Sequence, residues 1–428
     1  MQTVHIGLIG LGTVGGGVAE ILTRRREDFQ RHYDLDLRLS RVADRNTARF
    51  AQLGLDPALC TDDAFAVIAD PSVDIIIELI GGTGIAKEVV KAALEAGKTV
   101  VTANKALMAT SGHELLQISE DRGVELRFEA SVGGGIPIIE PLKHALTANE
   151  ITSVLGIVNG TTNYMLTHMA EQGLSYDDAL AQAQAKGYAE ADPSADVDGL
   201  DAAAKIAILA SIAFHSTVTL DEVHTEGIRT LSAVDVEYAA KMGYVIKLLA
   251  IAHRTDAGID IRVHPTMIPA DHQLAAVKGV YNAIYVTGDA VGDVMFFGEG
   301  AGAGAAASAV MGDVIEAARA RIYGNTTVGC TCTDDLALRP FEDLETSYYI
   351  RMVVDDKSGV LAQMTAVFAA HDVSVDSIMQ QGTAHDGTAE IIYVTHRARE
   401  AAVRAILDEL ESLDVVKDIA ALIRVEAL

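Results

Sequence analysis

The chain has 428 residues, more than one hydrophobic core usually supports, so two or three domains are expected. Half of the residues are hydrophobic, but only 5% are aromatic and Trp is absent, so Ala, Val, Ile and Leu must fill the core, as is typical of alternating helices and parallel strands. The formal net charge of -27 argues against nucleic acid or an anionic membrane as a partner. A phosphate-bearing cofactor is still compatible, because a helix N-terminus can bind phosphate locally.

The cysteines and the apolar runs predict a cytoplasmic protein. Cys60, Cys330 and Cys332 are too few for a disulfide framework, which favours a reducing compartment. Cys330 and Cys332 stand one residue apart and lack the spacing of zinc or thioredoxin-like sites. The sequence opens on a strand pattern with no signal-peptide features, and charges or Gly interrupt each apolar run before about 20 residues, so no membrane span is expected.

The first part of the chain alternates between apolar runs of strand length and helical patterns. Residues 3–10 predict a buried strand, and a glycine loop and a helix over 15–26 follow it. Further strands are expected at 37–43, 73–79, 99–102 and 124–130, with a helix over 86–96 that Gly97 ends. This pattern predicts an α/β domain over residues 1–132, with a Rossmann-like doubly wound parallel sheet that residues 308–325 complete.

From about residue 133 the pattern changes to that of an α+β domain, which is expected to extend to residue 325. Helices are predicted over 161–172, 175–186, 199–214 and 234–253, with strands at 151–158 and 284–288. Residues 326–346 are polar and low in pattern, which indicates a linker. Residues 347–428 contain strands at 348–354, 373–380, 389–395 and 422–425 and helices at 359–371 and 399–411, in the ferredoxin-like βαββαβ order.

The segment Gly10-Leu11-Gly12-Thr13-Val14-Gly15 matches the dinucleotide-binding pattern G-x-G-x-x-G. It follows a strand and opens a helix, which is the context that gives this short pattern meaning. Gly10 permits the tight turn, Gly12 lets the backbone approach a pyrophosphate, and Gly15 lets the helix pack on the strand. Thr13 and Val14 complete the loop, and the helix N-terminus offers N–H groups to the phosphates. The alternative is a glycine-rich turn without a ligand.

Asp44 and Arg45 follow the second predicted strand, at the position that distinguishes NAD from NADP. A carboxylate there binds the ribose diol of NAD, whereas an arginine pairs with the extra phosphate of NADP. Because both residue types are present, the sequence favours NAD or the use of both cofactors. The alternative is that both are solvated loop charges.

Six further segments, in one order along the chain, closely resemble homoserine dehydrogenases. They are ELIGGT (78–83), GKTVVTANKAL (97–107), FEASVGGGIP (128–137), GIVNGTTN (156–163), GYAEADP (187–193) and DVDGLDAAAK (196–205). The resemblance covers residues 4 to about 325. The chain departs from the family at residues 300–309 (GAGAGAAASA), which lack the usual Pro and Thr and leave loop closure open. Gly302 of this loop is expected at the cofactor.

The resemblance implies reversible NAD(P)-dependent hydride transfer between aspartate 4-semialdehyde and L-homoserine, a step in threonine, methionine and isoleucine biosynthesis. The second domain would then bind substrate and form a dimer. By resemblance Glu190, Asp201 and Gly187 bind the substrate and Lys205 is the proton donor. The predicted helix places Asp201 and Lys205 on one face, at positions i and i+4. Without the family motif, such a pair is usually an exposed salt bridge.

Lys105 follows a strand at the edge where open α/β sheets bind ligands, so it is expected to polarise the carbonyl and contact the nicotinamide. The resemblance also implies a Na⁺ site, with one carboxylate and three backbone carbonyls, since oxygen ligands suit a hard cation. The alternative is that the carboxylate only ties the loop down. The residues of this site would be Glu129, Val132, Gly134 and Ile136.

The last 82 residues resemble an ACT domain, a module that pairs through sheet edges and binds amino acids. The resemblance implies feedback inhibition by threonine, with the ligand carboxylate at the helix that Gly359 opens and its ammonium near Asp376 and Gln380. The alternative is a module that only assembles subunits. An exposed sheet edge favours a homodimer or homotetramer in either case.

Two other functions are weaker. A semialdehyde dehydrogenase that uses cysteine chemistry would need a nucleophilic Cys after the cofactor domain, and none is suitably placed. A non-catalytic amino-acid sensor would be expected to lack a lysine or the glycine loop, yet all are present. No fused kinase is expected, because no segment precedes Met1.

Overall fold

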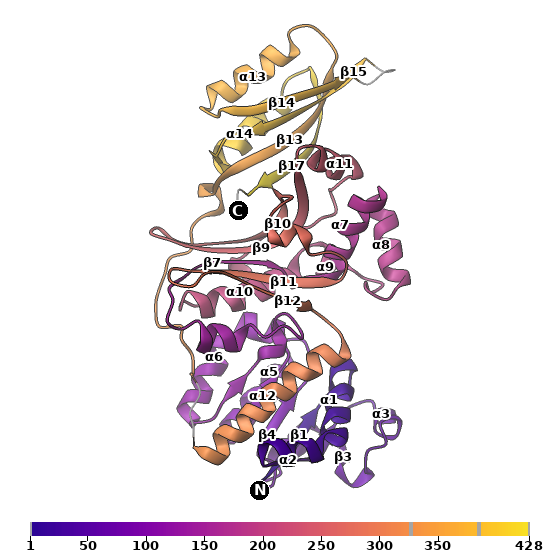
Figure 1. Cartoon of the computed structure of the whole chain (residues 1–428), viewed down its shortest axis with the longest axis vertical. Coiled ribbons are helices and arrows are strands. Elements are labelled where there is room, and N and C mark those ends of the chain that lie inside the picture. Colours follow the sequence, from indigo (N-terminus) through magenta and orange to yellow (C-terminus); the bar gives the residue numbers. More distant parts are fainter. Residues whose placement is uncertain (1, 325–327, 383–386, 427–428) are drawn as a thin grey trace. The chain divides into compact units, whose positions relative to one another are not determined.

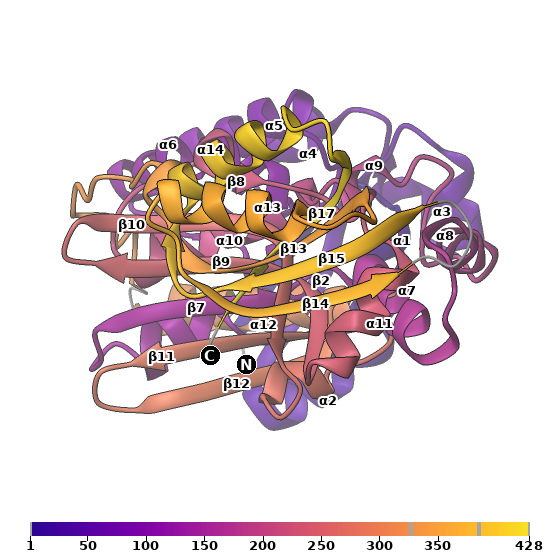
Figure 2. The same cartoon turned by 90° about the horizontal axis from the view of Figure 1, so that it is seen from above.

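The computed structural model describes residues 2–324, 328–382 and 387–426 (Figures 1 and 2). The chain forms two compact units, each assembled from segments that are distant in sequence. The first unit contains Met1–Val158, Ala204–Val223 and Tyr281–Leu336. The second unit contains Asn159–Ala203, His224–Val280 and Ala337–Leu428.

The first unit contains the predicted Rossmann-like sheet. Its strands are β1 (Gln2–Ile9), β2 (Leu35–Ala43), β3 (Cys60–Thr61), β4 (Ile75–Glu78), β5 (Thr99–Thr102) and β6 (Leu126–Arg127). They lie in the order β3-β2-β1-β4-β5-β6, and all neighbours are parallel. The strand order reverses between β1 and β4, which is where open α/β sheets bind their ligands.

The helices of this part cover the sheet. They are α1 (Thr13–Arg24), α2 (Arg26–Tyr33), α3 (Ala48–Gln52), α4 (Ala64–Ala69), α5 (Ile85–Glu95), α6 (Lys105–Arg122) and α12 (Ala303–Tyr323). Helix α12 comes from far along the chain and lies beside α1 (Figure 1). A Cβ at Gly17 of α1 would lie 3.0 Å from the carbonyl oxygen of Ala303, so a glycine allows this approach. Both helices bury apolar side chains in one core with the strands.

The first unit also contains three neighbouring antiparallel strands in the order β12-β11-β7. These strands are β7 (Ile151–Ile157), β11 (Tyr281–Gly288) and β12 (Gly292–Glu299). Helix α10 (Leu200–Ala213) begins in the second unit and continues into the first.

In the second unit, one sheet joins strands from the middle and the end of the chain, in the order β9-β10-β17-β13-β15-β14. The strands are β9 (Tyr244–Thr255), β10 (Gly258–Pro269), β13 (Glu345–Asp355), β14 (Val375–Gly382), β15 (Thr388–Thr395) and β17 (Val416–Val425), with short β8 (His224–Thr225) and β16 (Ala398–Arg399) at β10 and β13. The helices are α7 (Gly160–Gln172), α8 (Tyr176–Ala185), α9 (Ser194–Val197), α11 (Ala233–Lys241), α13 (Val360–Ala370) and α14 (Glu400–Glu411).

Residues 345–425 confirm the predicted βαββαβ order, with α13 and α14 packed on the same sheet (Figure 2). Strand β17 has a second role, because it pairs in parallel with β10, where Thr266 and Met267 face Arg424 and Val425. The C-terminal module therefore continues the sheet of the middle segment. Part of the predicted linker, residues 326 and 327, lies outside the described residues.

The predicted helix over 234–253 is wrong. Helix α11 ends at Lys241, Gly243 has φ +82°, and residues 244–255 form strand β9. The central residues of β9 are buried in succession, and an apolar run of this kind has no period that separates a helix from a strand. The predicted strand over 124–130 is also too long, since β6 covers only Leu126–Arg127 and a 3₁₀ turn over Glu129–Ser131 follows.

Among the described residues, none of the helices combines the length and apolar character that crossing a bilayer requires. In the same part of the chain, His, Cys, Asp and Glu side chains form no group of three or more that could hold a metal ion. All three cysteines have free thiols.

Candidate active site

The carboxyl ends of four parallel strands in the first unit surround a cavity of about 400 Å³. Gly10 and Gly12 follow β1, Asp44 and Arg45 follow β2, and Ile80 follows β4 along its wall. This is the predicted dinucleotide edge of the sheet, at the point where the strand order reverses.

Close backbone approach accounts for two glycines of the loop. Gly10 has φ +97°, and a Cβ there would lie 2.5 Å from the carbonyl oxygen of Leu79. A Cβ at Gly15 would lie 2.0 Å from the carbonyl oxygen of Gly10. A Cβ at Gly12, in contrast, would meet no atom within 4 Å in the described part of the chain, its two neighbours in sequence aside. The fold itself therefore needs glycine at positions 10 and 15. The backbone at Gly12 faces open space at the N-terminus of helix α1, whose first residue is Thr13.

Asp44 is tied to the glycine loop, because its carboxylate accepts the N–H of Leu11 on one oxygen and the N–H of Asn46 on the other. Arg45 is exposed in the cavity wall. Arg49 also supports the loop, since its Nε donates to the carbonyl oxygen of Leu11 at 2.9 Å. The sequence analysis missed Arg49, which lies beyond the predicted strand and carries no motif of its own.

Buried polar contacts shape the next strand ends. Glu78 accepts hydrogen bonds from the N–H of Ile80 at 2.7 Å and from the hydroxyl of Thr102 at 2.7 Å. Asn104 caps helix α6 by accepting the N–H of Leu107, and its Nδ2 donates to the carbonyl oxygen of Gly82. Lys105 is thereby held as the exposed first residue of α6, at the carboxyl end of β5.

In the second unit, Asn159 holds Asp201, one of the residues expected to bind substrate. Its Oδ1 accepts the N–H of Thr162 and caps helix α7. Its Nδ2 donates to Asp196 at 2.7 Å and to Asp201 at 2.9 Å. The sequence analysis quoted Asn159 within a family segment but gave it no role, although Asn before a helical pattern is a cap signal.

Helix α10 carries both Asp201 and Lys205, as predicted. Their exposed fractions are 6% and 7%, so they are not a solvated surface pair. Within the first unit, the Nζ of Lys205 donates to the carbonyl oxygen of Val158 at 2.6 Å. A buried lysine on a buried helix needs such an acceptor, because an ammonium without partners is costly to bury.

The loop over residues 187–190 is exposed except for Ala189. Gly187 has φ +75°, and the carbonyl oxygen of Tyr188 accepts the hydroxyl of Thr161 at 2.7 Å. This bond joins the loop to the first turn of α7, next to Asn159. Glu190 is thus presented to solvent from a fixed loop.

The buried carboxylate of Glu129 anchors its own loop. It accepts the N–H groups of Ile138 and Ile139 on Oε1 and that of Glu140 on Oε2. Burial raises the pKa of Glu129, although these bonds oppose the rise. Burial also raises the pKa of the neighbouring Asp313, which accepts the N–H of Glu129, to about 8.

These contacts leave little of the Glu129 carboxylate for an ion. One acceptor position on Oε2 remains, and Val132, Gly134 and Ile136 lie in the turn that the carboxylate holds together. A Cβ at Gly134 would lie 2.4 Å from the carbonyl oxygen of Gly300, so the turn packs against the start of the 300–309 loop. In that loop, Gly302 has φ +128° and caps helix α12. The Glu129 carboxylate therefore anchors its loop through backbone N–H groups.

The three residues expected to bind an effector lie in the C-terminal module. Gly359 has φ +91° and caps helix α13, while Asp376 and Gln380 lie exposed on strand β14. The carboxylate of Asp376 is 3.8 Å from the Nε2 of His396. Strand β14 ends its sheet, so its outer edge is available for pairing.

These features define a nicotinamide-dependent oxidoreductase. The first unit has a doubly wound sheet with a glycine loop where the strand order reverses and a lysine at the same edge, and the second unit has an aspartate that Asn159 holds in place. Comparisons with known proteins narrow this class. Family models match at residues 10–129 (homoserine dehydrogenase, NAD binding domain), 137–315 (homoserine dehydrogenase) and 348–415 (ACT domain). The chain belongs to the homoserine dehydrogenase family and is an NAD(P)-dependent oxidoreductase.

Full-length relatives agree with this assignment. The homoserine dehydrogenase of Synechocystis is 46% identical over 99% of this chain and 100% of its own, and that of Pseudomonas aeruginosa is 42% identical over 100% of both. The crystal structure of the homoserine dehydrogenase from Thiobacillus denitrificans has a TM-score of 0.94 at 41% identity, covering 100% of this chain and 99% of that one. A hyperthermophilic archaeal homoserine dehydrogenase in complex with NADPH has a TM-score of 0.65 at 27% identity, over 76% of this chain and 99% of that one.

Proposed function

We propose that Lys205 is the proton donor and acceptor in the interconversion of aspartate 4-semialdehyde and L-homoserine. The nicotinamide cofactor supplies and accepts the hydride when bound. In reduction, the Lys205 ammonium gives its proton to the carbonyl oxygen as the C–H bond forms, and in oxidation the neutral amine takes the proton from the hydroxyl. One observation carries this role. The Lys205 side chain is buried, lies on the same helix as Asp201 and donates to the carbonyl oxygen of Val158.

Lys105 is proposed to stabilise the developing alkoxide from the edge of the sheet. Its support is its position as the exposed first residue of α6, just beyond β5, where Asn104 fixes the helix start. A cation beside the reacting oxygen lowers the energy of the negative charge that forms there.

Asp201, Glu190 and Gly187 are proposed to hold the amino-acid end of the substrate. Carboxylates suit the ammonium group, and the bond from Asn159 fixes the direction of Asp201. The loop with Gly187 and Glu190 is exposed, so its carboxylate is accessible to a substrate that arrives from solvent. The role of Glu129 is proposed to be structural, and no step of the proposed reaction uses a bound metal ion.

The wild-type protein tests this function directly. With L-homoserine it should reduce NAD⁺ or NADP⁺, and with aspartate 4-semialdehyde it should oxidise the reduced cofactor, both followed by nicotinamide absorbance. Failure of homoserine to reduce either cofactor would contradict the proposal.

The wall of the dinucleotide cavity supports the use of NADP as well as NAD. Both carboxylate oxygens of Asp44 already accept backbone N–H groups, whereas the Arg45 side chain is exposed there. Arg45→Ala should lower kcat/KM for NADP⁺ by about 10-fold, because the extra phosphate loses a charged partner, and change kcat/KM for NAD⁺ less than about 2-fold. Arg24→Ala, which removes an exposed arginine of α1, is the control and should alter neither. An equal loss for both cofactors with Arg45→Ala would count against this assignment.

We propose that threonine inhibits the enzyme through the C-terminal module, where the start of α13 and Asp376 of β14 would bind its carboxylate and ammonium. Threonine should inhibit homoserine oxidation, and Asp376→Asn should raise the inhibition constant about 10-fold, because the ammonium loses its charged partner. Asp408→Asn, on the exposed side of α14, is the control. If threonine did not affect the activity, the C-terminal module would serve only to assemble subunits.

A homodimer or homotetramer in the cytoplasm is the proposed assembly. Besides the open edge of β14, the strands β11 and β12 expose Tyr281, Met295 and Phe297, and the rings of Tyr281 and Phe297 stack with centroids 5.1 Å apart. An exposed apolar face at a sheet edge is typical of a contact between subunits.

A further inference from the structure

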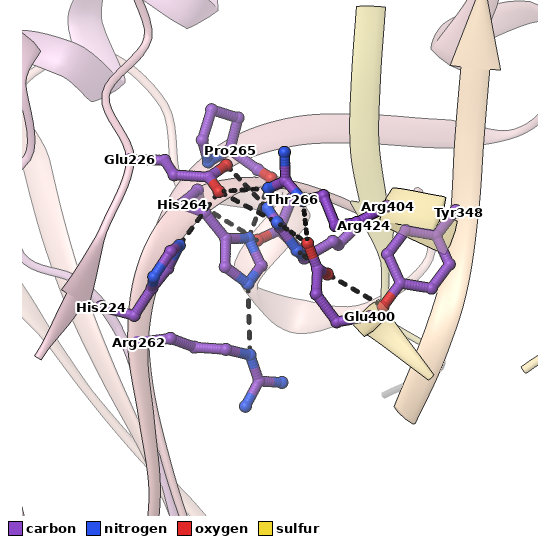
Figure 3. A network of polar contacts seen from close by, with 10 residues as sticks. All are labelled: His224, Glu226, Arg262, His264, Pro265, Thr266, Tyr348, Glu400, Arg404 and Arg424. Atoms are coloured by element: carbon purple, nitrogen blue, oxygen red, sulfur yellow. Dashed lines mark hydrogen bonds and ion pairs between the residues drawn. The ribbon is translucent and has the colours of Figure 1, made fainter. Parts of the chain in front are cut away.

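An ion cluster centred on a buried arginine lies where strand β17 joins strand β10 in the second unit (Figure 3). The Arg424 side chain is fully buried and forms a two-bond pair with Glu226, with Nη1 to Oε2 at 2.7 Å and Nη2 to Oε1 at 2.9 Å. Its Nη2 and Nε also donate to Glu400 of α14, at 2.7 and 2.9 Å. Arg404 also pairs with both carboxylates, so two arginines face two carboxylates. We call these four residues the Arg424 cluster.

Neighbouring side chains fix the geometry of the cluster. Figure 3 shows His224 and Glu226 reaching it from one side and Glu400, with Tyr348, from the other. The hydroxyl of Tyr348 donates to Glu400 at 3.0 Å, and His224 lies 3.0 Å from Glu226. A guanidinium that is held by two carboxylates in this way has little freedom to rotate. Glu226 is consequently fixed by the C-terminal module.

The segment that follows Glu226 touches the turn before helix α10 through backbone atoms. The N–H of Ile228 donates to the carbonyl oxygen of Val197 at 2.8 Å. A Cβ at Gly227 would lie 2.2 Å from that same oxygen, so only glycine fits. On the other side of the turn, Gly199 has φ +83°, and its Cβ would lie 3.0 Å from the side chain of Thr225. If residues 225–228 moved, residues 197–199 would therefore have to move with them.

The same turn leads directly to the proposed substrate site. Asp196 precedes Val197 and accepts a hydrogen bond from Asn159, which also donates to Asp201. Asp201 is the second residue of α10, and the N–H of Ala203 donates to the carbonyl oxygen of Gly199 in the first helical turn. Arg424, Glu226, residues 197–199 and Asp201 thus form a continuous series of contacts within one compact unit.

We propose that Arg424 and Glu226 are positioning residues for the substrate-binding site, and that they link the state of the C-terminal module to substrate affinity through Asp201. This inference rests on the proposed role of Asp201 in binding the amino-acid end of the substrate. The proton-transfer role belongs to Lys205 and the dinucleotide site to the first unit, so disturbing the cluster is expected to raise KM for homoserine while kcat and cofactor affinity change little.

A second buried ion pair in the same unit provides a matched control. Asp235 of α11 pairs with Arg351 of β13 through Nε at 2.7 Å and Nη2 at 3.1 Å, and both side chains are buried. This pair also joins the middle segment to the C-terminal module. Its other partners are Ser232, Tyr349 and Glu390, which lie outside residues 196–201 and 225–228.

The experiment compares Glu226→Gln, Arg424→Lys and Asp235→Asn with wild type in the full-length chain. The measurements are KM and kcat for homoserine, the dissociation constant of NADPH and the thermal midpoint. Glu226→Gln should raise KM about 10-fold, with kcat and the NADPH constant within about 2-fold of wild type. Arg424→Lys keeps the charge but loses the two-bond geometry, so its KM should lie between that of wild type and that of Glu226→Gln. Asp235→Asn should lower the thermal midpoint about as much as Glu226→Gln does, but its KM should stay within about 2-fold of wild type.

Three results would overturn the inference. In the first, Glu226→Gln leaves KM unchanged. In the second, its KM rises no more than that of Asp235→Asn, and in the third, kcat and NADPH affinity fall as much as KM rises. If Arg424→Lys does not fold, Glu226→Gln decides alone, since the Glu226 side chain is partly exposed and Gln retains its shape. A wild-type enzyme without activity on homoserine would refute the proposed function, whereas an active wild type with unchanged KM in the variants would refute the inference alone.

Discussion

Lys205→Ala is expected to lower kcat for homoserine oxidation by about 10²- to 10⁴-fold, the range that a general acid–base group contributes. The variant removes the ammonium that the Val158 carbonyl holds in place. KM for homoserine and the dissociation constant of NADPH should change less than about 3-fold, because binding uses other groups. Steady-state kinetics with saturating cofactor, together with a direct NADPH titration, measure all three quantities.

Lys98→Ala is the matched control for this experiment. Lys98 has an exposed fraction of 8%, and its Nζ donates to the carbonyl oxygens of Asp70 and Val73 at 2.7 and 2.6 Å. Its loss should reduce stability and leave kcat within about 2-fold, since it lies away from the dinucleotide edge. Turnover of Lys205→Ala at a rate near that of wild type would remove the lysine from the mechanism.

Gly12→Ala is expected to fold with wild-type stability yet to bind NAD(P)H at least about 30-fold more weakly. Among the described residues, and apart from its two chain neighbours, a methyl group at this position meets no atom within 4 Å, so the fold does not resist it. The space is the one that the pyrophosphate would occupy beside the start of α1, and a Cβ there keeps the phosphates from the backbone. Fluorescence titration with NADPH and a thermal melt of the ligand-free protein measure the two effects.

Gly10→Ala should give a different result and serves as the comparison. Its Cβ would require a left-handed conformation and would approach the Leu79 carbonyl oxygen to 2.5 Å. The ligand-free protein should lose about 2 kcal/mol or more of its unfolding free energy. If Gly12→Ala destabilised the ligand-free protein as much as Gly10→Ala, or bound NADPH as tightly as wild type, the assignment of Gly12 to the pyrophosphate would be wrong.

Features that depend on neighbouring residues were predictable. The glycine loop, the strand before it and the helix after it lie within the first thirty residues, and the short strand Thr99–Thr102 has the predicted limits. The C-terminal βαββαβ order was predictable for the same reason, since each strand and helix there ends at a local polar or glycine signal. The pattern failed at residues 244–255, where burial on both faces of β9 removes the alternation that identifies a strand.

The contacts between distant residues at the site could not be predicted. Arg49 supports the glycine loop from a short helix that has no motif, and Asn159 joins Asp196 to Asp201 across a long separation in sequence. Arg424 lies 198 residues from Glu226, and neither residue lies in one of the six short segments quoted for the resemblance. Pairing of β17 with β10 brings them together, and that pairing depends on the packing of two segments with no local signal for each other.

The sequence by itself therefore determined the class of chemistry, because a dinucleotide loop, the two lysines and the acidic substrate motif are local patterns with recognisable spacing. Tertiary structure decided how those groups are held: which backbone carbonyl receives Lys205, which amide directs Asp201, and which buried arginine connects the last strand to the turn before α10. The physical reason is that a buried charge needs partners within hydrogen-bond distance, and the fold alone determines which residues are close enough to serve.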